Sequence, residues 1–196
     1  MTNPASQITI VTGLPRSGTS LLMQMLEAGG LSLLCDDHRK PDADNPRGYY
    51  EYEPVKRSLR DLAWVDVAGG RAVKVVAPLL TKLPPDRPYR VLLLHRDLGP
   101  LLASQRVMLE RAGQADDGLP EPRLREILSA QWKDCESWCR SHASWLLVDH
   151  AQLLADPAAA SAQIAEFLGG ELDVAAMTRC VDPRLHRQRA SPSEPA

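Results

Sequence analysis

Hydrophobic residues in this chain fall into short apolar runs that alternate with longer segments of helical spacing. The continuous apolar run at 91–94 is typical of a strand that is buried on both faces of a sheet. In the segment 19–28, leucines and methionines recur at helical spacing before a pair of glycines ends the pattern. The pattern predicts strands at 7–12, 31–34, 71–76, 90–95 and 145–149, and helices at 19–28, 54–67, 100–112, 123–141, 156–168 and 173–180.

This alternation of strands and helices predicts an α/β protein. We expect a three-layer fold like that of the P-loop NTPases, with a central, mostly parallel sheet and helices on both faces. In such sheets ligands bind at the carboxyl ends of the strands. The loops that follow residues 12, 76 and 95 are therefore the places to look for a binding site.

Length and charge narrow the class of protein further. The 196 residues suffice for a single domain, expected at 1–189, and the Ser- and Pro-containing segment 190–196 predicts a flexible tail. A formal net charge of -2 argues against nucleic-acid binding, because such surfaces carry a cationic excess. No apolar run reaches the roughly 18 residues of a membrane span, and no signal peptide pattern is present. We expect a cytoplasmic protein whose oligomeric state is open, a homodimer being one expectation.

Cysteines and tryptophans are expected to serve the core. No histidine or further cysteine lies at metal-site spacing from the cysteines, so we expect buried, reduced thiols. These are Cys35, Cys135, Cys139 and Cys180. Packing in the core is favoured over an acceptor pocket for the tryptophans, which are Trp64, Trp132, Trp138 and Trp145.

A glycine-rich turn connects the first strand to the first helix. The segment 13–20, Gly-Leu-Pro-Arg-Ser-Gly-Thr-Ser, has the Gly-x4-Gly spacing of a phosphate-binding loop. Thr19 stands where nucleotide kinases have lysine, Arg16 places a cation inside the loop instead, and no Walker-B-like aspartate stands out. Mg²⁺-dependent phosphoryl transfer uses both missing features. A P-loop kinase or other phosphotransferase therefore stays as an alternative, as does a non-catalytic nucleotide-binding module.

A resemblance to the bacterial sulfotransferase family begins at this loop. The family's 5′-phosphosulfate loop looks like Pro15, Arg16, Ser17, Gly18, Thr19 and Ser20. Arg96 follows a predicted strand and Ser104 lies eight residues later, a spacing at which the family holds the 3′-phosphate of its donor. The segments 45–51, 153–157 and 181–185 also look like bacterial members. The resemblance implies metal-independent transfer of a sulfuryl group from 3′-phosphoadenosine 5′-phosphosulfate to a hydroxyl or amine acceptor.

The same resemblance implies roles at the reaction centre. Arg16 is expected at the leaving phosphate and Lys74 at the sulfuryl group. Members that act on small phenols and alcohols have a general-base histidine two residues after this lysine, where the present chain has Val76. Other members use a carboxylate after the second strand, and that place is taken here by Asp36, Asp37 and His38. Asp36 lines up best, and a solvated acidic loop that only caps the strand is the alternative.

The remaining contacts are expected from the later part of the chain. His150 stands where family members often place an aromatic residue against adenine. Arg184, Arg187 or Arg189 is expected to assist at the 3′-phosphate, because the family's glycine-rich loop with lysine is absent. The segments 36–52 and 106–142 are expected to contact the acceptor, but neither carries a recognisable specificity code.

Overall fold

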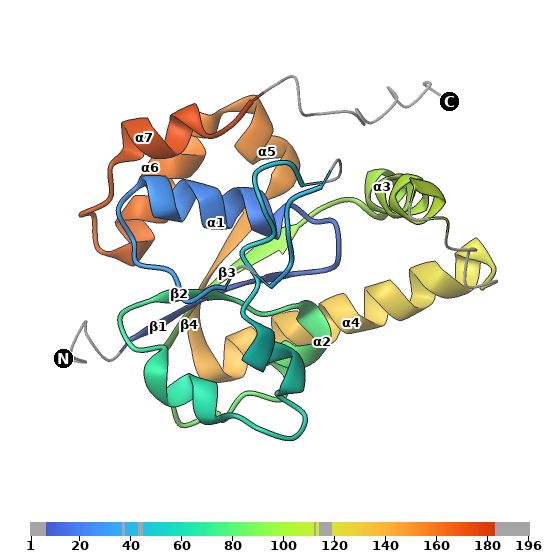
Figure 1. Cartoon of the computed structure of the whole chain (residues 1–196), viewed down its shortest axis with the longest axis horizontal. Helices are drawn as coiled ribbons and strands as arrows, with labels where there is room; N and C mark the ends of the chain where they lie inside the picture. Colours follow the sequence, from blue (N-terminus) through green and yellow to red (C-terminus); the bar gives the residue numbers. More distant parts are fainter. Residues whose placement is uncertain (1–6, 37, 43–44, 112, 114–118, 183–196) are drawn as a thin grey trace.

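A parallel sheet forms the centre of the molecule. The computed structural model describes residues 7–36, 38–42, 45–111, 113 and 119–182 (Figure 1). The sheet has the strand order β2-β1-β3-β4, with strands β1 (Ile8–Gly13), β2 (Ala72–Lys74), β3 (Tyr89–His95) and β4 (Ala143–Asp149). All three pairings between these strands are parallel, which confirms the predicted α/β class. Gly13 pairs with Leu94 and His95 with Asp149, so the carboxyl ends of β1, β3 and β4 meet at one edge.

Helices cover both faces of the sheet, as the alternating pattern predicts (Figure 1). One face packs against α1 (Thr19–Ala28), α6 (Pro157–Leu168) and α7 (Val174–Arg179), and the other against α2 (Ala77–Leu80) and α4 (Glu121–His142). The helices α3 (Leu98–Arg111) and α5 (His150–Ala155) begin just after the carboxyl ends of β3 and β4. They therefore lie at the edge where ligands bind in such sheets.

Two predicted elements are wrong. The segment 31–34 forms no strand and contributes only an isolated bridge between Leu33 and Ala72. The segment 54–67 is broken into two 3₁₀ helices, Glu53–Arg57 and Ala63–Val67. Between them, the Ser58 hydroxyl donates to the Val55 carbonyl oxygen at 2.6 Å, and the Asp61 carboxylate accepts from the Ala63 amide at 2.9 Å. Such local side-chain hydrogen bonds compete with a continuous helix.

Short elements at the sheet edge also differ from the prediction. The strand expected at 71–76 ends at Lys74, because α2 begins at Ala77 with Pro78 in its first turn. Helix α5 was not predicted. It starts directly after β4, with the Asp149 carboxylate accepting from the Gln152 amide at 2.9 Å. Both differences matter for the site, because α2 and α5 set the direction in which the chain continues from the carboxyl ends of β2 and β4.

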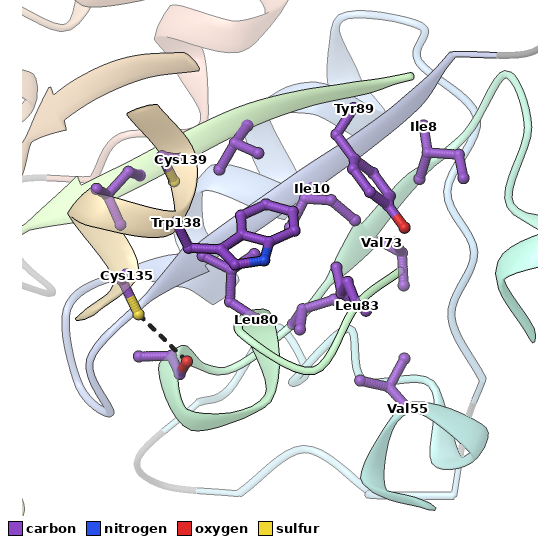
Figure 2. Close-up of a cluster of buried hydrophobic side chains, with 14 of the residues drawn as sticks. Ile8, Ile10, Val55, Val73, Leu80, Leu83, Tyr89, Cys135, Trp138 and Cys139 are labelled. Atoms are coloured by element: carbon purple, nitrogen blue, oxygen red, sulfur yellow. Dashed lines mark hydrogen bonds between the residues drawn. The ribbon is translucent and has the colours of Figure 1, made fainter. Parts of the chain in front are cut away.

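The core beneath the sheet is built around Trp138, which packs against Tyr89 with ring centroids 5.6 Å apart (Figure 2). Trp64 and Trp138 are buried, and Trp132 and Trp145 are partly buried against the same cluster, which confirms the packing role predicted for the tryptophans. Burial raises the pKa of both Cys135 and Cys139 to about 12.

The other two cysteines depart from the expected burial. Cys35 is exposed and Cys180 is partly buried, although all four are free thiols. Within the described ranges, no helix has the length and apolar character that crossing a membrane requires.

Candidate functional site

A cavity of about 550 Å³ opens at the carboxyl edge of the sheet. Its walls come from the turn after β1, the end of β2, the residue after β3, the start of α5, helix α3 and the loop 39–51. The three loops singled out from the sequence therefore meet at one site. Six cationic side chains line it, namely Arg16, Arg39, Arg47, Lys74, Arg96 and Arg111.

The turn between β1 and α1 has the tight geometry of an anion-binding loop. Arg16 and Gly18 have positive φ angles of 69° and 103°, and the Ser17 amide donates to the Leu14 carbonyl oxygen at 3.1 Å. A Cβ on Gly13 would lie 2.4 Å from the Ser17 Oγ, so only glycine fits where β1 enters the turn. The helix start at Thr19 then directs its amide groups toward the cavity. The turn can thus hold a phosphate or sulfate group by backbone contacts.

One polar side chain of this turn has no partner within the structure. The Ser17 hydroxyl is buried and makes no hydrogen bond to any described residue. Buried hydroxyl groups in folded proteins almost always have partners, because leaving one unsatisfied is costly. Ser17 does not line the cavity, and its Oγ lies on the Gly13 side of the turn, so this hydroxyl does not face the space in which a ligand would bind.

Arg16, Arg96 and Ser104 lie together on the α3 side of the cavity. The Arg96 guanidinium donates to the Arg16 carbonyl oxygen at 2.7 Å, and the Arg16 Nε donates to the Ser104 Oγ at 3.1 Å. Burial, together with the charge of Arg16, lowers the pKa of Arg96. Across the described residues, no carboxylate lies within ion-pair distance of either guanidinium. Among the described residues, these two neighbouring cations therefore have no carboxylate as a counter-ion.

Lys74 lies across the cavity from this pair, at the end of β2. Its ammonium group donates to the Ser20 Oγ at 3.0 Å and to the Tyr49 carbonyl oxygen at 2.9 Å. The residue is only 8% exposed. Burial therefore lowers the pKa of Lys74 to about 8, although the nearby Glu51 carboxylate acts in the opposite direction. A partly desolvated cation that faces the end of a phosphate loop can stabilise charge on a transferred group.

Glu51 is the carboxylate at the centre of this half of the cavity. Its Oε1 lies 3.0 Å from an Arg39 nitrogen and 3.9 Å from the Lys74 Nζ, while its Oε2 lies 3.3 Å from the Lys56 Nζ. The Arg39 guanidinium also stacks on the Tyr49 ring, 3.3 Å from its centroid. Three cations from three separate segments of the chain thus hold one carboxylate at the cavity wall.

The predicted base Asp36 lies outside this wall. Its Oδ2 accepts from the Glu53 amide at 2.6 Å and its Oδ1 from the His38 amide at 3.1 Å. Burial by itself raises the pKa of Asp36, but these two amide contacts and nearby positive charge hold the pKa below its ordinary value. His38 does not line the cavity either, and Asp37 lies outside the described residues. Their role as general base stays a prediction, and the geometry of Asp36 is that of a loop cap.

Of the other predicted contacts, some line the cavity and some lie outside the described residues. His150 lines the cavity, and its Cδ2 would lie 2.7 Å from a Cβ placed on Gly18, so its ring packs directly on the phosphate loop. Val76 also lines the cavity, so the position two residues after Lys74 carries no ionisable group. Arg184, Arg187 and Arg189 lie outside the described residues.

Sequence reasoning missed Glu51 and Arg39 as site residues. Glu51 ends the family-like segment 45–51 and Arg39 directly follows the predicted base region; both lie in the segment 36–52 expected to contact the acceptor, but neither was given a role of its own. The available signal was the pair of opposite charges, Arg39 and Glu51, within one polar loop. The hydrogen bond from the Asp36 amide to the Glu51 carbonyl oxygen, 2.8 Å long, brings the two ends of this loop together. That pairing is tertiary and has no pattern in the sequence.

Comparison with known proteins supports the fold at the level of structure alone. No protein-family model matches the chain, and no curated protein matches it in sequence. The structure is similar to the sulfotransferase domain of the olefin synthase from Synechococcus PCC 7002, with a TM-score of 0.53, 18% identity and coverage of 96% of this chain and 90% of that domain. A sulfotransferase from Alicyclobacillus acidocaldarius aligns with a TM-score of 0.49 at 17% identity, over 86% of this chain and 82% of its own. The chain shares its fold with the Synechococcus sulfotransferase domain.

Proposed function

We propose that this chain is a sulfotransferase that uses 3′-phosphoadenosine 5′-phosphosulfate as its donor. The observation that carries the proposal is the pair Arg16 and Arg96, two adjoining guanidinium groups beside a phosphate loop with no carboxylate at ion-pair distance among the described residues. Cations arranged in this way repel each other until an anion binds between or beside them. The donor carries two anionic groups, at its 3′ and 5′ positions, and the cavity offers cations for both.

In this proposal the phosphate loop holds the 5′-phosphosulfate. Backbone amides of the turn and the start of α1 bind its oxygens, and Arg16 stabilises the charge that develops on the leaving phosphate. Arg96 and Ser104 bind the 3′-phosphate as a forked cation and a hydroxyl donor. His150, which packs on the loop at Gly18, stacks on adenine. Arg184 and Arg187 are proposed to assist at the 3′-phosphate.

Lys74 is proposed to bind the sulfuryl group during transfer. Its ammonium group donates to the Ser20 hydroxyl and the Tyr49 carbonyl oxygen, and these two bonds leave one of its three N–H groups for a ligand or for Glu51. The acceptor, a hydroxyl or amine compound, then approaches from the side of the loop 39–51. The acceptor oxygen or nitrogen attacks sulfur in line with the departing phosphate oxygen. Positioned cations supply the charge stabilisation, so the transfer does not depend on Mg²⁺.

Phosphoryl transfer is less well supported by the residues at the loop. Thr19 stands at the position of the kinase lysine, and its side chain is buried at the start of α1. The cation that reaches the cavity from β2 is Lys74, which approaches from the side opposite Arg96 and Ser104. This arrangement fits a group transferred between two sets of cations better than a metal-bridged triphosphate.

Calorimetry with 3′-phosphoadenosine 5′-phosphate tests the proposal directly, because this compound is the product that the donor leaves behind. We expect tight binding that Mg²⁺ does not change, and weaker binding of ATP with or without Mg²⁺. Transfer of labelled sulfate from the donor to a panel of hydroxyl and amine compounds then tests turnover. Stronger binding of ATP with Mg²⁺ would show that the proposal is wrong. Product binding without any transfer would favour a non-catalytic nucleotide-binding module.

A further inference from the structure

A sulfuryl transfer to a hydroxyl needs a group that accepts the acceptor's proton, and few described residues at the cavity can do so. Of the described residues that line it, two carry carboxylates, Glu51 and Asp182. Asp182 lies 3.8 Å from Arg47, whose guanidinium also donates to the Cys180 carbonyl oxygen, next to the C-terminal end of α7. Glu51 instead lies beside Lys74, which the proposed function places at the sulfuryl group.

We propose that Glu51 is the general base of the transfer, an inference that rests on the proposed function. Its Oε1 lies 3.9 Å from the Lys74 Nζ, close enough for an acceptor hydroxyl to contact the base while it attacks a sulfuryl group held by that ammonium. The position is fixed by cations on several elements. Arg39 approaches from the loop, Lys56 from the 3₁₀ helix Glu53–Arg57 and Lys74 from β2.

The charged groups around Glu51 explain why it keeps one orientation. Arg39 is itself held flat against Tyr49, and Tyr49 donates through its hydroxyl to the Asp42 carboxylate at 2.7 Å. Lys56 is shared with Glu53, whose carboxylate lies 2.8 Å away. A base that is locked by its neighbours meets the geometric demand that general-base catalysis makes on the proton acceptor.

The step balances without any further reactant. The acceptor oxygen forms a bond to sulfur while the bond between sulfur and the bridging phosphate oxygen breaks. The electron pair of that broken bond stays on the phosphate of the 3′-phosphoadenosine 5′-phosphate product. The acceptor proton passes to a Glu51 carboxylate oxygen, and Glu51 returns it to solvent after the products leave.

Asp36 is less suited to this role, although the two residues are neighbours in space. The Asp36 amide donates to the Glu51 carbonyl oxygen at 2.8 Å, so the two ends of the loop run side by side. Both Asp36 carboxylate oxygens accept backbone amides, which hold this carboxylate as a cap of the loop. Glu51 presents its carboxylate to the cavity and Asp36 does not.

The test compares Glu51→Gln with Glu53→Gln and Asp36→Asn. Glu53 is a matched control, because it also pairs with Lys56 but does not line the cavity. The assay begins with hydrolysis of the labelled donor, in which water is the acceptor, and continues with hydroxyl acceptors of graded acidity. Affinity for 3′-phosphoadenosine 5′-phosphate is measured by calorimetry and folding by circular dichroism. Glu51→Asp, which keeps the carboxylate but shortens its reach, provides a second variant.

For Glu51→Gln we expect kcat to fall by about 10²-fold or more, with product affinity unchanged within about twofold. The acid limb of the kcat–pH profile should disappear, and the deficit should shrink as the acceptor becomes more acidic, because an ionised acceptor needs no base. Glu51→Asp should keep the acid limb with a smaller loss, and Glu53→Gln should resemble the wild type. A purely structural role for Glu51 would change neither the pH profile nor the dependence on acceptor acidity.

Two results would overturn the inference, and they separate it from the proposed function. If Glu51→Gln keeps wild-type turnover and its acid limb while Asp36→Asn loses both, the proposed function stands and the base is Asp36. If the wild type neither binds 3′-phosphoadenosine 5′-phosphate nor consumes the donor, the proposed function fails and the role of Glu51 fails with it.

Discussion

The cationic side chains in the two halves of the cavity differ in whether they pair with a carboxylate of the protein's described residues. On the α3 side, Arg16 and Arg96 contact a backbone carbonyl and a hydroxyl, and no carboxylate of the described residues pairs with them. On the loop side, Lys74, Arg39 and Lys56 surround the carboxylate of Glu51. Unpaired cations are suited to bind a ligand's anion, whereas paired cations are suited to hold a carboxylate of the protein in place.

The halves also differ in what shapes them. The phosphate loop is shaped by its backbone, since Gly13 and Gly18 stand where a side chain would collide with Ser17 and His150. The loop side is shaped by side chains from segments far apart in the chain, with Lys74 bonded to Ser20 across 54 positions. This contrast predicts that changes on the first side act on donor affinity, and changes on the second side on turnover and stability.

The largest expected effect is on donor affinity, through Arg96→Ala. Loss of a partly buried charge contact should weaken 3′-phosphoadenosine 5′-phosphate by about 2–4 kcal/mol, which corresponds to roughly 30- to 1000-fold. Adenosine 5′-phosphosulfate, which lacks the 3′-phosphate, should be hardly affected. Calorimetry with both ligands measures the difference. Arg106→Ala is the control, because Arg106 is exposed and pairs with Glu121 instead. Equal losses for both ligands would mean that Arg96 supports the phosphate loop and does not bind the 3′-phosphate.

The second-largest expected effect is a pH dependence of the free energy of unfolding that arises from Lys74. Folded Lys74 loses its proton near pH 8 and an unfolded lysine near 10.5, so the unfolded chain binds more protons between these values. The free energy of unfolding should therefore rise with pH across this window, by on the order of 3 kcal/mol from this residue. Arg16, Arg39, Lys56 and Glu51 act on the same group, with Glu51 opposing the shift.

Denaturant titrations of the wild type and Lys74→Met from about pH 7 to 11 isolate this contribution, because other titrating groups cancel in the difference. The wild type should gain stability relative to the variant as the pH rises through 8. A difference that stays flat or falls would mean that the loop side holds Lys74 as an ordinary paired cation. The contrast between the two halves would then be smaller than the structure indicates.

Two glycines, Gly18 and Gly30, test the phosphate-loop half of the cavity, which is shaped by its backbone. Gly18 and Gly30 have similar positive φ angles of 103° and 93°, but an added Cβ meets His150 at 2.7 Å only at Gly18. Gly30→Ala should cost about 1 kcal/mol of stability, from backbone strain alone. Gly18→Ala should cost about 2 kcal/mol, because displacement of His150 is added, and should also weaken 3′-phosphoadenosine 5′-phosphate. Thermal unfolding and calorimetry give both quantities, and equal behaviour of the two variants would remove His150 from the donor site.

The phosphate loop and the central strands could be predicted from the sequence because their signals are local. The strands predicted at 7–12 and 90–95 match β1 and β3 to within one residue at each end, and the glycine spacing at 13–18 is set by one turn. The helix expected at 54–67 failed because Ser58 and Asp61 bond to nearby backbone groups, and hydrophobic spacing does not register such bonds.

The loop side could be predicted only in part, for a different reason. Lys74 was expected at the site from the resemblance to the sulfotransferase family, and it lies on a strand that pairs with β1 in the sheet. Glu51 reaches the cavity because its backbone pairs with Asp36 and its carboxylate meets cations from three segments. The resemblance favoured Asp36, which lines up best with the family's carboxylate, but the path of the loop turns that residue toward backbone amides instead.

The smallest expected effect comes from Ser104→Ala, which tests whether Ser104 orients Arg16 or binds the 3′-phosphate. Ser104 accepts from the Arg16 Nε at 3.1 Å, and the proposal also makes its hydroxyl a donor to the 3′-phosphate. Loss of one such hydrogen bond should weaken 3′-phosphoadenosine 5′-phosphate by about 1 kcal/mol, roughly fivefold. Binding of adenosine 5′-phosphosulfate distinguishes the two contacts, since only the link through Arg16 concerns that ligand. Ser141→Ala is the control, because its hydroxyl donates within α4 to the Ser137 carbonyl oxygen. If both ligands lose the same affinity, Ser104 acts by orienting Arg16, and the 3′-phosphate is left to Arg96.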